Sequence, residues 1–271
     1  MNRSTHKISV ITITLNSAHD LKKTMVSVLG QDYPQIEYII IDGGSTDGTL
    51  EVIKTNAGHV ACWISEPDRG IYDAMNKGLA KATGEWVNFM NAGDVFNNDH
   101  VLSAVFNHDP GDAAVLYGDS IAHYPAFNAW RKARSPEDLW KGMFCCHQSM
   151  FFRTSLIKNE GYRTGDCFSA DYEMIHRLYH AGKTFRYIPE TIAVFDTRGI
   201  SNMQMVKSAR SNLEILSSFR TLTLKERRFH RWVIFKSALT EWMYKFLPSP
   251  VIHSMLRQVY RNQIISESSR P

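Results

Sequence analysis

The stretch Glu85-Trp-Val-Asn-Phe-Met-Asn-Ala-Gly-Asp94 decides the fold of this chain. An apolar run of strand length, Trp86 to Met90, is followed at once by the turn-forming residues Asn91 to Gly93. We therefore expect a buried central strand that delivers the Asp94 carboxylate to the edge of a sheet. Ligands of open α/β sheets bind at that edge, so Asp94 is a candidate metal or phosphate ligand. The alternative is that Asp94 caps a helix beginning near Asn97.

Two more predicted strands precede this one. Ile8 to Leu15 alternates apolar residues with Ser and Thr, and Ile36 to Ile41 is an almost continuous apolar run, as in parallel strands covered on both faces. Apolar residues at helical spacing separate the two runs. The order strand, helix, strand and then the glycine-rich turn Asp42 to Gly48 predicts a Rossmann-like α/β sheet flanked by helices, with a nucleotide site at its carboxyl edge.

The glycine-rich turn matches neither of the two common phosphate-binding loops. It lacks the GxGxxG spacing and follows the second strand, which argues against a hydride-transfer cofactor. The chain also has no GxxxxGK[ST] loop, which argues against a nucleoside triphosphatase. The structural alternative is a tight turn in which Asp47 caps a helix over Thr49 to Thr55.

Bulk composition indicates a globular, intracellular protein. The chain has 271 residues, of which 44% are hydrophobic, enough for one large domain with an appendage. No run of about 20 apolar residues occurs, and we expect no secretory signal. The four cysteines show no metal-ligand spacing, which predicts reduced thiols in the cytoplasm: Cys62, Cys145, Cys146 and Cys167.

Charge divides the chain into two unequal parts. Residues 203–271 carry a net charge of +8, whereas residues 1–202 carry −4. We therefore expect a catalytic domain over 1–202 and a basic helical extension over 203–271. Nucleic acid is not an expected partner, because basic residues and exposed aromatics are not interleaved over the main domain.

The extension contains a basic amphipathic pattern. Six large apolar residues recur at helical spacing among several arginines and lysines: Trp232, Phe235, Leu239, Trp242, Met243 and Phe246. Such a helix suits the anionic inner face of the cytoplasmic membrane, which predicts a cytoplasmic, peripherally bound protein. The alternatives are that the helix packs on the catalytic domain or on a second copy of the chain.

Three segments in order carry a resemblance to a known family. They are IDGGSTDGT (41–49), SEPDRGIYDAMNKG (65–78) and ATGEWVNFMNAGD (82–94). Together they resemble the family 2 glycosyltransferases, inverting enzymes of the GT-A fold, and most of all the branch that builds bacterial exopolysaccharide and O-antigen repeats. The resemblance covers Ile8 to Ser201.

The resemblance implies a nucleotide-sugar donor, UDP-linked rather than GDP-linked, and a Mg²⁺ or Mn²⁺ ion. Asp94 matches the last acid of the family's metal motif, although Asn91 and Gly93 stand where many relatives carry Asp. On the nucleotide side, Gly43 stands where many relatives carry a second acid after Asp42. A divalent cation held there would stabilise the departing diphosphate. The implied donor-binding residues are Thr14, Asn16, Asp42, Asp68, Asn91 and Arg198, the last within a loop over 197–201 that would fold over the donor.

On the acceptor side the resemblance assigns Asp171 as the general base. Asp171 lies at the start of a predicted helix, with Ala170 in place of the family's Glu, and the alternative is a simple capping acid. His147 and Gln148 match a His-Gln pair expected on the acceptor or diphosphate side. The implied acceptor is a saccharide, carried on a lipid, in surface polysaccharide synthesis. Two other functions stay open: a sugar nucleotidyltransferase, and a non-catalytic nucleotide-sugar or membrane-binding partner.

Overall fold

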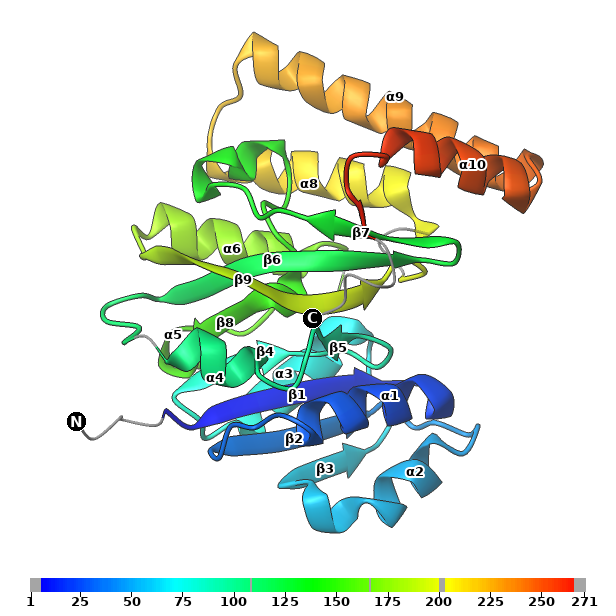
Figure 1. Cartoon of the computed structure of the whole chain (residues 1–271). Coiled ribbons are helices and arrows are strands. Elements are labelled where there is room, and N and C mark those ends of the chain that lie inside the picture. Colours follow the sequence, from blue (N-terminus) through cyan, green and yellow to red (C-terminus); the bar gives the residue numbers. More distant parts are fainter. Residues whose placement is uncertain (1–5, 108, 166, 200–202, 266–271) are drawn as a thin grey trace.

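The computed structural model describes residues 6–107, 109–165, 167–199 and 203–265 (Figure 1). One mixed sheet runs through the molecule in the order β10-β7-β6-β8-β4-β1-β2-β3, with β9 beside β6 and β5 beside β9. The strands are β1 (Ile8–Thr14), β2 (Ile36–Asp42), β3 (Cys62–Ser65), β4 (Trp86–Phe89), β5 (Val95–Phe96), β6 (Val115–Tyr124), β7 (Phe127–Arg131), β8 (Met150–Arg153), β9 (Phe185–Asp196) and β10 (Ile264–Ile265).

Helices cover both faces of the sheet and one end of the molecule (Figure 1). The α-helices are α1 (Ala18–Leu29), α2 (Thr49–Thr55), α3 (Ile71–Lys81), α4 (Val101–Phe106), α5 (Thr154–Lys158), α6 (Ala170–His180), α8 (Met205–Phe219), α9 (Leu224–Phe246) and α10 (Ser249–Val259). Short 3₁₀ turns are η1 (Ala57–His59), η2 (Pro136–Lys141) and η3 (His147–Ser149). The expected α/β sheet with a C-terminal helical extension is confirmed.

Burial of both sheet faces explains the apolar strands. In β1, Ile11 and Ile13 belong to one buried cluster, whereas Ile8 and Val10 belong to a second cluster on the opposite face. Successive side chains of a strand point to opposite faces, so both sets must be apolar. Strands β4, β1, β2 and β3 are parallel, and their carboxyl ends therefore lie at one edge of the sheet.

The prediction of a helix beginning near Asn97 is wrong. Asp94 is followed by β5, whose Val95 and Phe96 pair with Val194 and Ala193 of β9, and α4 begins only at Val101. Pairing with β9 holds this segment extended. Asp94 therefore does not cap a helix, and the capping alternative is excluded.

The sequence segments 184–188 and 191–195 each predict a closing strand, but the structure joins them in a single strand, β9. It runs parallel to β6 through Pro189, with a register shift that sets Tyr117 opposite Tyr187 but Asp119 opposite Thr191. Gly118 makes room for the extra residues, because a β-carbon there would lie 2.6 Å from the Glu190 carbonyl oxygen. Proline is tolerated at such a bulge since no ladder hydrogen bond is required of it.

The C-terminal extension packs on the end of the sheet that contains β7. β10 pairs with β7, and the His230 Nε2 of α9 lies 2.8 Å from the carbonyl oxygen of Trp140. The predicted domain division after residue 202 falls at residues 200–202, which lie outside the described residues, so it stays a prediction. In the described part of the chain, no helix is both long and apolar enough to cross a membrane.

A buried carboxylate at the opposite edge of the sheet gives a test of stability. Glu37 accepts hydrogen bonds from Lys7 at 2.7 Å, from the Ser9 hydroxyl at 2.6 Å and from the backbone N–H of Thr83 at 2.7 Å. Burial opposes ionisation of Glu37, but these hydrogen bonds prevail and lower its pKa from 4.5 to about 2. The lowered pKa contributes stability above pH about 4.5, and this contribution is lost as the pH falls toward about 2.

We expect Glu37→Gln to lower the free energy of unfolding by about 2 to 3 kcal/mol at neutral pH. The difference from the unmodified chain should shrink between pH about 4.5 and about 2. Denaturant unfolding at neutral and acidic pH measures both effects. Glu51→Gln, on the exposed side of α2, is the control and should change little. A pH-independent difference would contradict the assigned role of the carboxylate.

Candidate active site

The carboxyl ends of β1 and β2 bring two predicted donor residues together. Thr14 and Asp42 are the last residues of these strands and pair in the sheet register. Asp42 is completely buried and accepts hydrogen bonds from the Ser65 hydroxyl at 2.7 Å and from the backbone N–H and hydroxyl of Ser45. The Thr14 hydroxyl is buried and has no hydrogen-bond partner in the described chain. It is therefore available to a polar ligand group.

Asn16 joins the first loop to the glycine-rich loop. It has a positive φ of 49°, which Asn tolerates better than most residues. Its Oδ1 accepts a hydrogen bond from the Thr46 N–H at 2.9 Å, and its own N–H donates to the Ser45 hydroxyl at 2.7 Å. Asn16 thus holds the loop after Asp42 in place, and its direct contact with a donor stays a prediction.

Asp68 and Gly43 lie against each other at the same edge. A β-carbon added at Gly43 would be 2.4 Å from Asp68 Oδ2, while Asp68 Oδ1 accepts a hydrogen bond from the Gly70 N–H at 2.9 Å. The acid that many relatives carry after Asp42 would therefore displace Asp68. Glycine at position 43 leaves this space to the Asp68 carboxylate.

Hydrogen bonds from Thr24 of α1 hold the turn that carries Asp94. The Thr24 hydroxyl donates to the Asp94 carbonyl at 2.8 Å, lies 3.3 Å from the Asn91 carbonyl, and accepts from the Gly93 N–H at 3.0 Å. Gly93 has a φ of +100°, which an acid at this position would adopt only with strain. The turn geometry therefore explains why glycine replaces an acid here.

The Asp94 carboxylate itself is only 6% exposed. Its Oδ2 accepts from the Gln148 side chain at 2.5 Å, and its Oδ1 accepts from the Asp196 N–H at 3.0 Å. Burial, together with the nearby charges of Asp196 and Asp20, raises the pKa of Asp94 to about 7 despite both hydrogen bonds. The side chain thus lacks a compensating positive charge.

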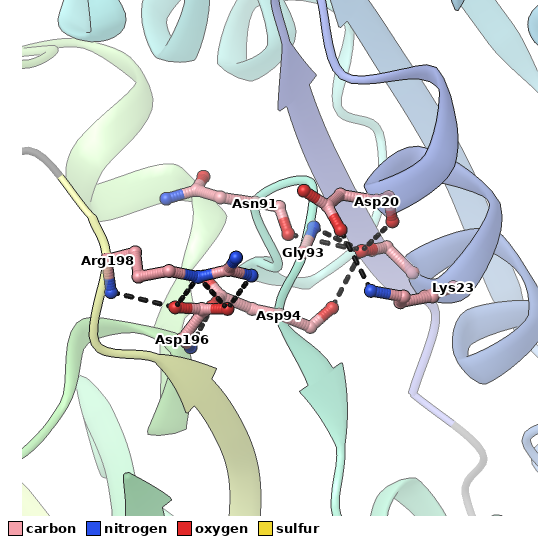
Figure 2. A network of polar contacts seen from close by, with 8 residues as sticks. Asp20, Lys23, Asn91, Gly93, Asp94, Asp196 and Arg198 are labelled. Carbon is pink, nitrogen blue, oxygen red and sulfur yellow. Dashed lines mark hydrogen bonds and ion pairs between the residues drawn. The ribbon is translucent and has the colours of Figure 1, made fainter. Parts of the chain in front are cut away.

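Arg198 lies beside this group but is paired with Asp196 (Figure 2). Its Nη2 is 2.6 Å from Asp196 Oδ2, and its Nε contacts both carboxylate oxygens at 3.0 Å. Burial opposes ionisation of Asp196, but these contacts lower its pKa. A contact between Arg198 and a diphosphate stays a prediction. Of the loop expected over 197–201, residues 200 and 201 lie outside the described chain.

The residues around Asp94 fit a hard divalent cation. The cation would supply the missing positive charge, and the Asn91 Oδ1 on the same turn is buried without a hydrogen-bond partner in the described chain. Over the described residues no group of three or more His, Cys, Asp or Glu side chains is placed to hold a metal. The remaining ligands for Mg²⁺ or Mn²⁺ would therefore come from a diphosphate and water.

Asp171 lies in the first turn of α6 and is partly exposed. Its Oδ1 accepts a hydrogen bond from the Tyr72 hydroxyl at 2.9 Å, and the Tyr72 ring stacks on Tyr162 at 5.8 Å between centroids. Burial and the charge of Asp171 raise the pKa of Tyr72, which keeps it a neutral donor. Ala170, in place of the family's Glu, is completely buried in the core. The helix start and Tyr72 together orient the Asp171 carboxylate.

The segment 146–149 lies between the two carboxylates. Cys146 donates to the Gln148 Oε1 at 2.8 Å, and Gln148 in turn donates to Asp94. Burial raises the pKa of the Cys146 thiol, and the charges of both Asp94 and Asp171 raise it further. The adjacent His147 contacts Tyr162, whose ring stacks on Tyr72, the hydrogen-bond donor to Asp171. This segment therefore connects the surroundings of Asp94 with those of Asp171.

His147 lies on the inner side of this segment. Its ring packs against Phe89 and Phe152, and its Nε2 is 3.0 Å from the Tyr162 hydroxyl. Burial lowers the pKa of His147, so the ring is neutral at physiological pH. Its placement supports the tyrosine pair that orients Asp171, and direct contact with an acceptor stays a prediction for both His147 and Gln148.

Three residues of the site were not expected from the sequence. Asp196 ends an apolar strand, the same signal that pointed to Asp94, and could have been found. Tyr72 was expected only as an inward-facing helix residue, and its hydroxyl contact depends on how α3 and α6 pack. No local signal marks Thr24, because its partners lie far away in the sequence.

Comparisons with known proteins identify relatives of this chain and solved structures of similar fold. A relative from Mycobacterium bovis, a "PGL/p-HBAD biosynthesis glycosyltransferase", is 32% identical over 204 residues, covering 72% of this chain and 78% of the relative. Among solved structures, a Pyrobaculum calidifontis mannosyltransferase in complex with GDP-Man and Mn²⁺ has a TM-score of 0.65 at 18% identity, covering 95% of this chain and 82% of that one.

A second solved structure is Staphylococcus aureus TarS in complex with UDP-GlcNAc, with a TM-score of 0.60 at 15% identity, covering 90% of this chain and 77% of that one. These two structures support the GT-A fold. The family model described as "Glycosyl transferase family 2" matches residues 9–178. The chain therefore belongs to glycosyl transferase family 2.

Proposed function

We propose that this glycosyltransferase inverts the anomeric configuration as it moves a hexosyl group from a UDP-sugar to a saccharide. The acceptor is carried on a lipid, in the assembly of a bacterial surface polysaccharide. One observation carries the proposal most directly: a chain of contacts joins Asp94 and Asp171, which are far apart in the sequence. Gln148 donates to Asp94, and the adjacent His147 contacts Tyr162. The Tyr162 ring in turn stacks on Tyr72, which donates to Asp171. A donor-side acid and an acceptor-side base must border the same space in such a reaction.

On the acceptor side, the Asp171 carboxylate removes the proton from the attacking hydroxyl. The hydroxyl oxygen bonds to the anomeric carbon from the face opposite the diphosphate, and the bond from that carbon to the diphosphate oxygen breaks. The product is therefore inverted, with the proton on Asp171 and the electron pair on the leaving nucleoside diphosphate. Tyr72 keeps the carboxylate oriented by donating to Oδ1 at 2.9 Å.

On the donor side, Asp94 and Asn91 would hold Mg²⁺ or Mn²⁺, with Asp196 close by. When bound, the cation would neutralise charge on the departing diphosphate. The Arg198 guanidinium is 2.6 Å from Asp196 and would need to leave that carboxylate to reach the diphosphate. The unpartnered Thr14 hydroxyl, with Asp42 and Asp68, would bind the base and ribose.

Two solved structures and one relative support parts of this proposal. The structural neighbours were solved with UDP-GlcNAc in one case and with GDP-Man and Mn²⁺ in the other, which supports a nucleotide-sugar donor. The M. bovis relative is named for PGL/p-HBAD biosynthesis, which supports a biosynthetic role for the transfer.

A thermal-shift panel tests the donor. We expect UDP and UDP-sugars with Mn²⁺ to raise Tm by several degrees, because ligand at a hundredfold excess over Kd stabilises by about 2.7 kcal/mol. GDP with Mn²⁺ and UDP with EDTA are the controls and should give smaller shifts. Stabilisation by GDP alone would exclude the uridine donor, and no shift with any nucleotide would exclude a nucleotide-sugar donor altogether.

A further inference from the structure

Helix α9 presents a continuous apolar face to solvent. Trp232, Phe235, Leu239, Trp242 and Phe246 are between 48% and 67% exposed. Their spacing alternates between three and four residues, which places them on one side of the helix. This set of five residues is called the α9 face below. Such large, clustered apolar exposure marks an interaction surface rather than scattered surface residues.

The opposite side of α9 is the one that packs on the protein. Glu226 and His230 are the buried residues of the helix, and His230 contacts the Trp140 carbonyl. Glu241, also away from the α9 face in helical angle, accepts a hydrogen bond from the Val206 N–H at the start of α8. Figure 1 shows α9 as an outer layer at one end of the molecule, with α8 between it and the sheet. The α9 face therefore points outward.

Positive charge borders the α9 face on both sides. Lys236 lies 5.4 Å from the centre of the Trp232 ring, and Lys245 lies 5.5 Å from that of Phe246. Lys245 and Arg231, which is exposed, lie on one border by helical angle, and Lys236 lies on the other. The two acids of α9 do not offset these charges, because Glu226 is paired with Arg220 and Glu241 with the α8 backbone. The face is thus apolar at its centre and cationic at its rim.

This charge pattern decides between two partners. A second copy of the chain could in principle meet the α9 face, since the alternating spacing is that of a coiled-coil seam. The positions flanking that seam include Arg231, Lys236 and Lys245 and no acid, so two copies would set like charges against each other. An anionic lipid surface instead supplies the opposite charge, and tryptophan and phenylalanine suit the headgroup region.

We propose that the α9 face docks on an anionic bilayer surface. The aromatic side chains enter the headgroup region, and the lysines and arginines at the rim contact lipid phosphates. This inference goes beyond the proposed reaction and does not depend on it, because it rests on α9 alone.

Co-sedimentation of the full chain with vesicles tests the proposal. We expect binding to vesicles of phosphatidylcholine with added phosphatidylglycerol, weakening as salt rises, and little binding to phosphatidylcholine alone. Replacing Arg231, Lys236 and Lys245 by glutamine should weaken binding about a hundredfold, since each cation near the surface contributes about fivefold. Replacing Trp232, Phe235 and Trp242 by alanine should weaken it more than about tenfold.

A matched control removes the same charge elsewhere. Lys22, Lys54 and Lys81 are exposed on the catalytic part of the chain, and their replacement by glutamine should leave vesicle binding almost unchanged. Equal loss in this control, equal binding to neutral vesicles, or no binding by the unmodified chain would overturn the proposal. So would light scattering that shows a dimer dispersed by the aromatic variant without any vesicle binding. Tm of each variant, expected to be unchanged because the replaced side chains are exposed, separates lost docking from lost folding.

Discussion

Replacing Asp171 by asparagine is expected to lower kcat by about 10²- to 10⁴-fold, the usual contribution of a positioned general base. Asparagine keeps the shape of the side chain and can still accept the hydrogen bond from Tyr72, but it cannot take the acceptor proton. Donor binding should change little, because the loss is confined to the transferring step. Initial rates with the identified donor and titration calorimetry of the nucleotide measure the two quantities.

Two further variants make this test specific. Asp112→Asn, at a side chain that is 83% exposed, should retain full activity. Tyr72→Phe keeps the ring stack on Tyr162 but removes the hydrogen bond that orients Asp171, so it should lower kcat by less than Asp171→Asn and shift its pH profile. An Asp171→Asn enzyme that keeps more than about a tenth of its activity would remove this residue from the role of base.

Replacing Asp94 by alanine is expected to weaken nucleotide binding in Mn²⁺ by at least about tenfold, since even residues that only support a metal ligand contribute 10- to 100-fold. In EDTA the variant and the unmodified chain should bind the nucleotide alike. Titration calorimetry in both buffers measures the difference. Asp94→Asn is the matched variant, because it fills the same space between Gln148 and Asp196 and so avoids a cavity. If both variants keep the response to Mn²⁺, Asp94 does not hold the cation.

Much of the fold could be predicted because its causes are local. The strands of the parallel half bury both faces, so β1, β2 and β4 appear as apolar runs that end in polar turns. The helix expected near Asn97 failed because β5 is held extended by β9, about a hundred residues later. The bulge opposite Gly118, which joins two expected strands into β9, was also hidden because its partners lie far apart in the sequence.

The candidate site also has features with local causes, which could be predicted, and features that depend on long-range contacts, which could not. Asp42, Asp94 and Asp171 could be located because each stands at the end of a strand or the start of a helix. The hydrogen bonds of each carboxylate could not be predicted, because their partners come from distant parts of the sequence. Asp94 is held by Gln148 and Asp196, and Asp171 by Tyr72, and these contacts form only after the sheet and α6 have packed.

The hydrogen bonds of Thr24 to the turn before Asp94 show that the shape of this turn and the acidity of its side chains are separate properties. The path of this turn is held by the Thr24 hydroxyl of a neighbouring helix and by backbone hydrogen bonds of Ala92 and Asp94, without an acidic side chain at position 91 or 93. The shape of this turn therefore requires no acid at position 91 or 93, and the positive φ at position 93 disfavours one. A search for sister enzymes that demands an acid-rich signature would pass over chains built in this way, whereas one that pairs a helix threonine with a glycine before the last aspartate would retrieve them.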